Sequence, residues 1–156
     1  MTKDIRTRPG RYFEDYPVGA VYAGGPVEVS EQDILDFARR FDPQPMHTDK
    51  AAAETGPFGG LIASGWHTGS LMMQLLARHF VPTPGNLPSP GLDELRWLRP
   101  VRPGDRLSLR ATVESARRSR SKPDQGVVIS YVELLNQDGD VAMSLKPVSL
   151  MRCRPV

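Results

Sequence analysis

The sequence predicts an α+β fold in which one antiparallel β-sheet wraps around a single long, buried helix. The segment His67–Phe80 reads as a helix whose apolar residues nearly encircle it, which is typical of a buried helix. Beyond it, strand candidates alternate with turn signals such as PGD and QDGD, which indicates an antiparallel meander. A chain of 156 residues is long enough for one core, so we expect a single domain over residues 1–156.

The first half of the chain is expected to supply extended chain and then a helix. Residues 11–29 show partial alternation of apolar and polar side chains. Ser30 is a favourable N-cap for a helix expected over Glu31–Arg40. Pro43 stops that helix, and proline also restricts the residue before it, so Asp42 should leave helical geometry.

The remaining elements follow from breakers and periodicity. A short helix is expected at about Thr48–Glu54, with Asp49 in its first turn. The proline-rich connection Val81–Pro90 is irregular and is expected to form part of a pocket wall. The strand candidates are residues 92–101, 106–116, 126–136 and 141–152.

Composition and charge argue against several classes of protein. The net charge of +2 is too small to indicate a nucleic-acid-binding protein, and no aromatic residues interleave with the basic run Arg117–Lys122. That run reads as a solvated hairpin tip or as a contact for an anionic ligand. No apolar run is long enough to cross a bilayer, and the N-terminus has no apolar signal region. Since Cys153 is the only cysteine, we expect a cytoplasmic protein without disulfides.

The loop FDPQPMHTD (residues 41–49) combines an acid, an amide and a histidine with two prolines. A carboxylate at Asp42 and an imidazole at His47 could hold one water from two sides. Imidazole titrates near neutrality, and a carboxylate does so if burial raises its pKa. The prolines would keep the pair preorganised. The competing interpretation is a helix C-cap at Asp42 and a surface histidine that begins the next helix.

The glycine-rich segment GGLIASGWHTG (residues 59–69) leads into the buried helix. The backbone N–H of Gly65 lies near the start of that helix, where the amides carry partial positive charge and suit a developing oxyanion. A tight turn that packs against the sheet is the alternative. Trp66 and Trp97 are interpreted as core or interface residues, not as cofactor stackers.

Other kinds of site find little support. The histidines and Asp49 match no metal-ligand spacing, so no metal site is expected. Ser64 lacks the surrounding G-x-S-x-G elbow of a serine hydrolase. No phosphate-binding glycine loop is present.

The two motifs, taken together, resemble the MaoC-like, (R)-specific enoyl-CoA hydratase family of hotdog-fold proteins. Members carry an Asp-x-Asn-Pro-x-His loop after a helix, then a glycine at the start of the buried helix. Here the loop reads Asp42-Pro43-Gln44-Pro45-Met46-His47, and ELRWLRPVRPGDRLSL (residues 94–109) resembles the family's PV-x-x-GD turn. The resemblance covers about residues 30–109, with compatible strands beyond.

The resemblance implies a hotdog fold and a hydratase or dehydratase. Asp42 and His47 would activate a water that adds across the double bond of a trans-2-enoyl-CoA and gives an (R)-3-hydroxyacyl-CoA. Gly65 would polarise the thioester carbonyl, and its neighbours Ser64 and Trp66 are assigned with it to the oxyanion and substrate-binding part of the site. No metal or redox cofactor is implied, since CoA arrives as part of the substrate.

Two positions depart from the family pattern. Gln44 replaces the family's Asn, and with Pro45 it is expected to support the loop. Met73 stands where some members carry a serine, which leaves the substrate class open. A hotdog thioesterase would carry an acid on or beside the helix, and His67–Phe80 has none. A non-catalytic acyl-CoA-binding domain is the other alternative.

A homodimer is expected as well. One long sheet around one apolar helix leaves an edge or a face uncovered, and a second copy would hide it.

Overall fold

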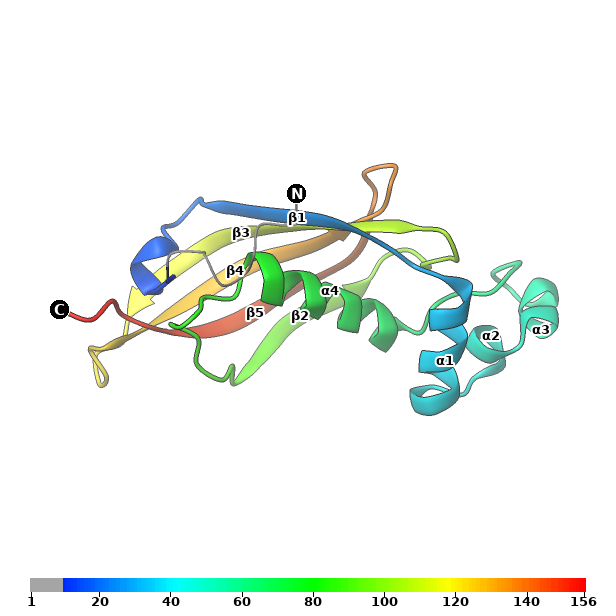
Figure 1. The fold of residues 1–156 in the computed structure, drawn as a ribbon, viewed down its shortest axis with the longest axis horizontal. Coiled ribbons are helices and arrows are strands. Elements are labelled where there is room, and N and C mark those ends of the chain that lie inside the picture. The colour runs from blue at the N-terminus through cyan, green and yellow to red at the C-terminus, as the bar shows by residue number, and fades with distance from the viewer. Residues whose placement is uncertain (1–9) are drawn as a thin grey trace.

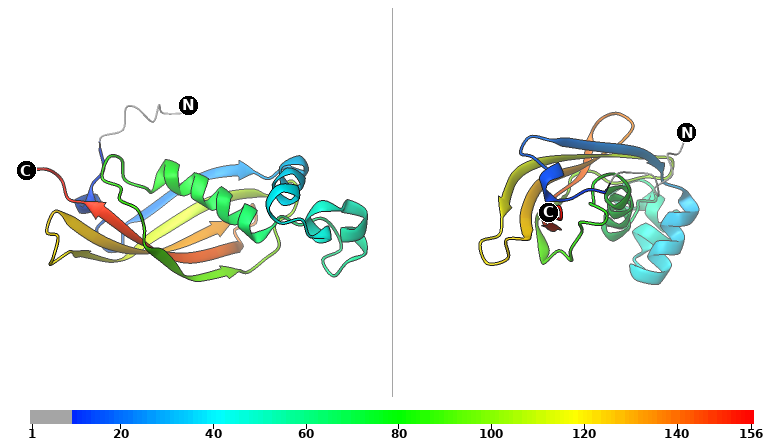
Figure 2. Two further views of the ribbon diagram at one scale, coloured as in Figure 1. Left: turned by 90° about the horizontal axis from the view of Figure 1, so that it is seen from below. Right: turned by 60° about the vertical axis from the view of Figure 1, so that its left-hand side comes forward.

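The computed structural model describes residues 10–156 and shows a five-stranded antiparallel sheet that curves around one long helix (Figures 1 and 2). The strands are β1 (Val21–Glu28), β2 (Gly91–Trp97), β3 (Arg106–Arg118), β4 (Gln125–Leu135) and β5 (Val141–Arg152). Their order is β1-β3-β4-β5-β2, and every neighbouring pair is antiparallel. The helices are the short 3₁₀ helix η2 (Phe13–Asp15), α1 (Glu31–Phe41), α2 (Pro45–Thr48), α3 (Lys50–Thr55) and α4 (Gly65–His79). The predicted α+β class is confirmed. The first nine residues, where a signal region would begin, lie outside the described part.

The core lies between α4 and the sheet face that curves toward it (Figure 2). Met72 and Leu75 of α4 are fully or almost fully buried. The central strands β3 and β4 alternate buried and less buried residues, as expected for strands with one face on a core. Their buried apolar side chains are Leu107, Leu109, Ala111, Val113, Val128, Val132 and Leu134.

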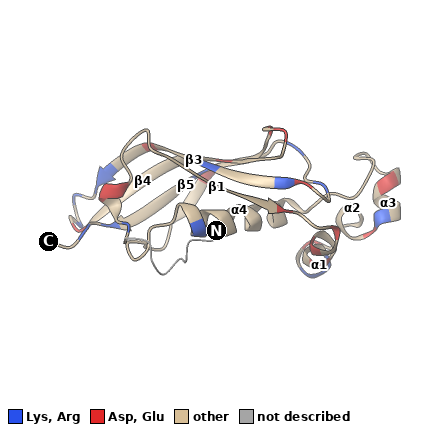
Figure 3. Cartoon of the chain, turned by 45° about the horizontal axis from the view of Figure 1, so that its top comes forward, with Lys and Arg blue, Asp and Glu red and all other residues tan. Residues whose placement is uncertain are grey.

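Helix α4 is less completely buried than its encircling apolar pattern predicts. Trp66 and Met73 lie on the side away from the core, and their exposed fractions are 61% and 50%. Figure 3 shows charged residues of both signs on α1 and α3, whereas α4 is uncharged over most of its length. A single copy of the chain therefore leaves one side of its central helix uncovered, where Trp66 and Met73 lie among polar residues such as Ser70 and Gln74.

Helix α1 ends as the prolines predict. The side chain of Ser30 accepts a hydrogen bond from the N–H of Asp33 at 3.1 Å and caps the helix. The helix continues one residue further than expected, to Phe41. Asp42 is its C-cap, and its backbone angles (φ −153°, ψ 69°) are not helical. The proline after Asp42 thus turns the carboxylate out of the helix.

The helix expected at about Thr48–Glu54 is present as α3, which starts at Lys50 and ends at Thr55, and a further short helix, α2, precedes it. Pro45 opens α2 at a first-turn position, where its missing N–H costs nothing. Asp49 separates α2 from α3 and caps α3, because its Oδ1 accepts the N–H of Ala52 at 3.1 Å. Prolines and an aspartate cap therefore divide the segment more finely than periodicity suggested.

The strand predictions hold apart from their ends. The first candidate, residues 92–101, stops at Trp97, although the N–H groups of Leu98 and Arg99 still donate to the carbonyl of Ala142. The basic run begins in the last two residues of β3 and continues into the connection to β4, as expected for a hairpin tip. No helix among residues 10–156 is long and apolar enough to cross a bilayer.

Candidate active site

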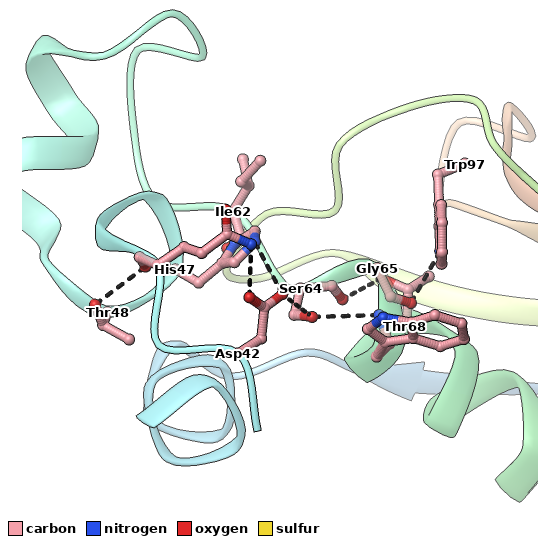
Figure 4. Close-up of polar contacts among 10 residues, drawn as sticks. Asp42, His47, Thr48, Ile62, Ser64, Gly65, Thr68 and Trp97 are labelled. Atoms are coloured by element: carbon pink, nitrogen blue, oxygen red, sulfur yellow. Dashed lines mark hydrogen bonds and ion pairs between the residues drawn. The ribbon is translucent and has the colours of Figure 1, made fainter. Parts of the chain in front are cut away.

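Asp42 and His47 face each other where the chain leaves α1 and enters α2 (Figure 4). Nε2 of His47 lies 3.4 Å from Oδ2 of Asp42. The imidazole is 7% exposed and the carboxylate 16%. The structure thus brings the two residues together, and the surface histidine of the competing interpretation is wrong. The expected C-cap at Asp42 is present, and it orients the carboxylate toward the imidazole.

The tautomer of His47 follows from its second ring nitrogen. Nδ1 lies 2.8 Å from the carbonyl oxygen of Ile62. A carbonyl can only accept, so Nδ1 carries a hydrogen and donates it. In the neutral ring Nε2 is then a bare acceptor that points at another acceptor, Oδ2 of Asp42. A shared proton, or a water that donates to both atoms, suits this arrangement.

Both oxygens of Asp42 already accept hydrogen bonds. The hydroxyl of Ser64 donates to Oδ2 at 2.6 Å, and Nε2 of Gln44 donates to Oδ1 at 2.6 Å. These bonds, from Ser64 first and Gln44 second, hold the pKa of Asp42 below its ordinary value, because burial opposes them only weakly. Burial was the condition under which Asp42 could titrate near neutrality, and with a lowered pKa that condition is not met. Gln44 does support the loop, through this bond.

The contribution of Asp42 to the free energy of unfolding should decrease at low pH. Its folded-state pKa lies below the ordinary unfolded value, so the contribution is complete above that value and disappears as the pH falls through the folded pKa. The difference in unfolding free energy between wild type and Asp42→Asn should therefore shrink as the pH falls below about 5. Urea titrations at pH values below about 5 measure it. Asp36→Asn, on the exposed side of α1, is the control. A difference that grows as the pH falls through this range would contradict the assignment.

The start of α4 lies against the indole of Trp97. Ser64 is the N-cap, and its hydroxyl accepts the N–H of Trp66 at 3.3 Å. Nε1 of Trp97 donates to the carbonyl of Gly65 at 2.9 Å (Figure 4). A Cβ on Gly65 would lie 2.5 Å from Cε2 of that ring, which explains why glycine stands here. The rings of Trp66 and Trp97 meet edge to face, with centroids 5.3 Å apart.

These residues border an open cavity of about 420 Å³. Ser64 does not line it, since its side chain is turned to Asp42 and is fully buried. The connection Val81–Pro90 does not line it either, so the predicted pocket wall is wrong for this cavity. Among residues 10–156, Arg99 is the only lysine or arginine on its wall. The lining residues are Asp42, Gln44, His47, Phe58, Ile62, Ala63, Gly65, Trp66, Thr68, Trp97, Leu98, Arg99, Pro100 and Val101.

The sequence matches the family described as "MaoC like domain" over residues 14–134, which is well over half of the chain. The chain belongs to the MaoC-like domain family. The resemblance seen in the two motifs is thereby confirmed.

Solved structures of relatives agree with this family in sequence and shape. A MaoC-like dehydratase from Rhodospirillum rubrum is 38% identical, with a TM-score of 0.85 over 94% of this chain and 100% of that one. The R-hydratase PhaJ1 from Pseudomonas aeruginosa is 26% identical, with a TM-score of 0.72 over 94% of this chain and 88% of that one. The hotdog fold is therefore confirmed.

A curated relative agrees as well. A 3-hydroxybutyryl-CoA dehydratase from Methylorubrum extorquens is 28% identical over 86% of this chain and 83% of its own length. This MaoC-like chain is thus similar to proteins named as dehydratases and hydratases along nearly its whole length.

Several features of this MaoC-like site were not visible in the sequence. The bond from Ser64 to Asp42 joins residues 22 positions apart, and the bond from Trp97 to Gly65 joins residues 32 apart. The cavity wall includes Trp97, which the sequence placed only in the core or an interface, beside Trp66, which was also assigned to the substrate-binding part of the site. Only one local signal existed, namely that a serine directly before a helix is a common N-cap.

His67 lies next to this machinery but does not line the cavity. Its ring stacks on Phe37 of α1, with centroids 4.9 Å apart, and burial lowers its pKa. It helps to pack α1 on α4. Within residues 10–156, no group of three or more His, Cys, Asp and Glu side chains is arranged to hold a metal ion.

Proposed function

We propose that this protein is a hydratase or dehydratase that adds water across the α,β double bond of an enoyl-CoA and gives an (R)-3-hydroxyacyl-CoA. The observation that carries the proposal is the facing pair of acceptors, Oδ2 of Asp42 and Nε2 of His47, on the wall of an open cavity. The dehydratases and hydratases among its relatives support the reaction class.

The pair would hold the attacking water. Its two O–H groups would donate to Asp42 and His47, and its lone pair would be free to attack the β-carbon. The loop is braced by Gln44 and by Pro45 at the start of α2, so the pair need not be ordered when substrate arrives.

The thioester oxygen would lie at the start of α4. The first N–H groups of a helix have no partner within the helix, and they carry the positive end of its dipole. Gly65, the first residue of α4, lies on the cavity wall, so its N–H is suited to the negative charge that develops on the oxygen. Trp66 would close the substrate-binding part of the site beside it. Ser64, once grouped with these two residues, would act through Asp42 instead.

The bond changes balance without a cofactor. One O–H bond of water breaks, its oxygen forms the C–O bond at the β-carbon, and the electron pair of the double bond moves toward the thioester oxygen. The proton then returns to the α-carbon. We infer that no metal or redox group takes part and that CoA enters only as part of the substrate.

An assay with a panel of enoyl-CoA thioesters tests the function. Loss of the enone absorbance, with chiral analysis of the 3-hydroxyacyl product, is the expected result for at least one chain length. Saturated acyl-CoAs with a thiol reagent are the control. Release of free CoA would indicate the thioesterase alternative, and binding without turnover would indicate an acyl-CoA-binding domain.

We also propose that two copies of the chain form a homodimer through β2 and the exposed side of α4. β2 is an edge strand, so its outer backbone groups lack a neighbouring strand within the described chain. Leu92 on this strand is 48% exposed, and Met73 on α4 is 50% exposed. An edge strand can pair antiparallel with its own copy about a twofold axis, which would cover both elements together.

Light scattering after size exclusion should give about twice the 17.3 kDa of one chain. Met73→Glu should shift the protein toward the single chain, because a charge would be buried in the interface. Val18→Glu, a matched change at a site 65% exposed between η2 and β1, should leave the mass unchanged. A wild-type protein with the mass of one chain at micromolar concentration would exclude the homodimer.

A further inference from the structure

We propose that Ser64 is a positioning residue that fixes the direction and the ionised state of Asp42, so that His47 alone carries the proton. The assignment of His47 rests on the proposed hydration, whereas the link between Ser64 and Asp42 can be tested without any substrate.

The hydroxyl of Ser64 accepts one hydrogen bond and donates another, and each has a defined partner. As acceptor it takes the N–H of Trp66, because Ser64 caps α4. As donor it gives its hydrogen to Oδ2 of Asp42 at 2.6 Å. The side chain is fully buried. Its rotamer is therefore set by the helix that it caps, and the helix in turn sets where the carboxylate points.

The carboxylate of Asp42 is surrounded by donors. Gln44 donates to Oδ1 and Ser64 donates to Oδ2, and each bond is 2.6 Å long. Hydrogen bonds donated to a carboxylate stabilise its charged form more than its neutral form, so these two donors favour the anion. Asp42 can then accept a hydrogen bond from the water at Oδ2 but is a poor proton acceptor.

His47, in contrast, is arranged to accept a proton. Its Nδ1–H is held by the carbonyl of Ile62, and Nε2 is left bare beside Oδ2 of Asp42. Nε2 takes the proton as the water oxygen bonds to the β-carbon. The imidazolium that forms is stabilised by the carboxylate at 3.4 Å. Nε2–H then protonates the α-carbon, and the neutral ring is restored.

The titration of the Asp42 carboxyl carbon, followed by ¹³C NMR, tests the role of Ser64. In Ser64→Ala the pKa of Asp42 should rise, because the hydrogen bond that does most to lower it is lost. kcat should fall about tenfold to a hundredfold, the equivalent of one hydrogen bond to a charged group. Ser70→Ala is the matched control, since this hydroxyl lies on the same helix and donates only to the carbonyl of Trp66.

A second variant guards against a folding defect, since Ser64→Ala also removes a helix cap. Gln44→Met removes the other donor at an exposed position whose side chain caps no helix. It should raise the pKa of Asp42 as well. An unchanged Asp42 titration in Ser64→Ala overturns the positioning role, whatever the activity and whatever Gln44→Met shows. A wild type that hydrates no enoyl-CoA overturns the proposed function and the proton route, while the titration still reports on Ser64.

Imidazole rescue tests the proton route. Added imidazole should restore part of the rate of His47→Gly, because the missing ring leaves space beside Asp42. Formate should not restore Asp42→Gly to a similar degree. Rescue of Asp42→Gly alone, or no rescue of His47→Gly, overturns the assignment of His47.

Discussion

Asp42→Asn should hydrate enoyl-CoA on the order of 10²–10⁴ times more slowly than wild type while remaining folded. Asparagine keeps the size of the side chain but removes the charge that would hold the water and stabilise the protonated ring. His47→Gln should lose a similar factor, because an amide can still bond to the carbonyl of Ile62 but cannot carry a proton.

Steady-state kinetics, with acyl-CoA binding measured by calorimetry, separates chemistry from binding. The fall should be in kcat, with affinity changed little. Asp49→Asn is the matched control. It is the same chemical change in the same loop, and asparagine caps a helix as well as aspartate does, so α3 should persist. Near-wild-type rates in both site variants would exclude this pair as the catalytic residues.

Gly65→Ala should lower both activity and stability. The new Cβ would lie 2.5 Å from Cε2 of Trp97, so the indole or the first turn of α4 must move. Overpacking of this kind costs about 1–3 kcal/mol. Moving a donor away from a developing oxyanion costs on the order of 10²–10³ in kcat.

A double-mutant cycle shows whether the clash is the cause. Trp97→Leu in the Gly65→Ala background should recover a substantial part of the lost stability, because the space then exists. Gly69→Ala is the control on the same helix. Its nearest neighbour, Cε of Met143, would lie 3.5 Å from the added atom, which is ordinary contact. If Gly65→Ala is as stable and active as Gly69→Ala, the close approach of Trp97 to Gly65 is not needed for stability or activity.

Local signals predicted the elements well, because each depends on neighbours in the chain. Pro43 ends α1 near Phe41, the PGD turn separates β2 from β3, and the QDGD turn separates β4 from β5. The missed division between α2 and α3 has a local cause too, since Asp49 was expected inside a first turn and instead caps α3. The ends of helices were mispredicted where two local signals, such as a proline and a helix cap, lie within a few residues of each other.

Only some contacts of the site could be predicted from the sequence, for a different reason. Asp42 and His47 are five residues apart, so their pairing could be expected from the loop alone. Ser64 reaches Asp42 and Trp97 reaches Gly65 only after the chain has folded around α4. The encircling apolar pattern of α4 predicted burial without saying what would cover each side. In one copy the sheet covers only the side that carries Met72 and Leu75.

The position of α1, α2 and α3 at one end of the sheet has an engineering consequence (Figure 1). Asp42, Gln44, His47, Ser64 and Gly65 all come from one uninterrupted stretch of 24 residues, while the opposite wall comes from residues 97–101. The reactive groups therefore lie on one contiguous segment of the chain, and the wall residues can be substituted without changing that segment. Swapping residues 98–101 between relatives, with Trp97 kept because it bonds to Gly65, should retune acyl preference and leave the bond-making step in place.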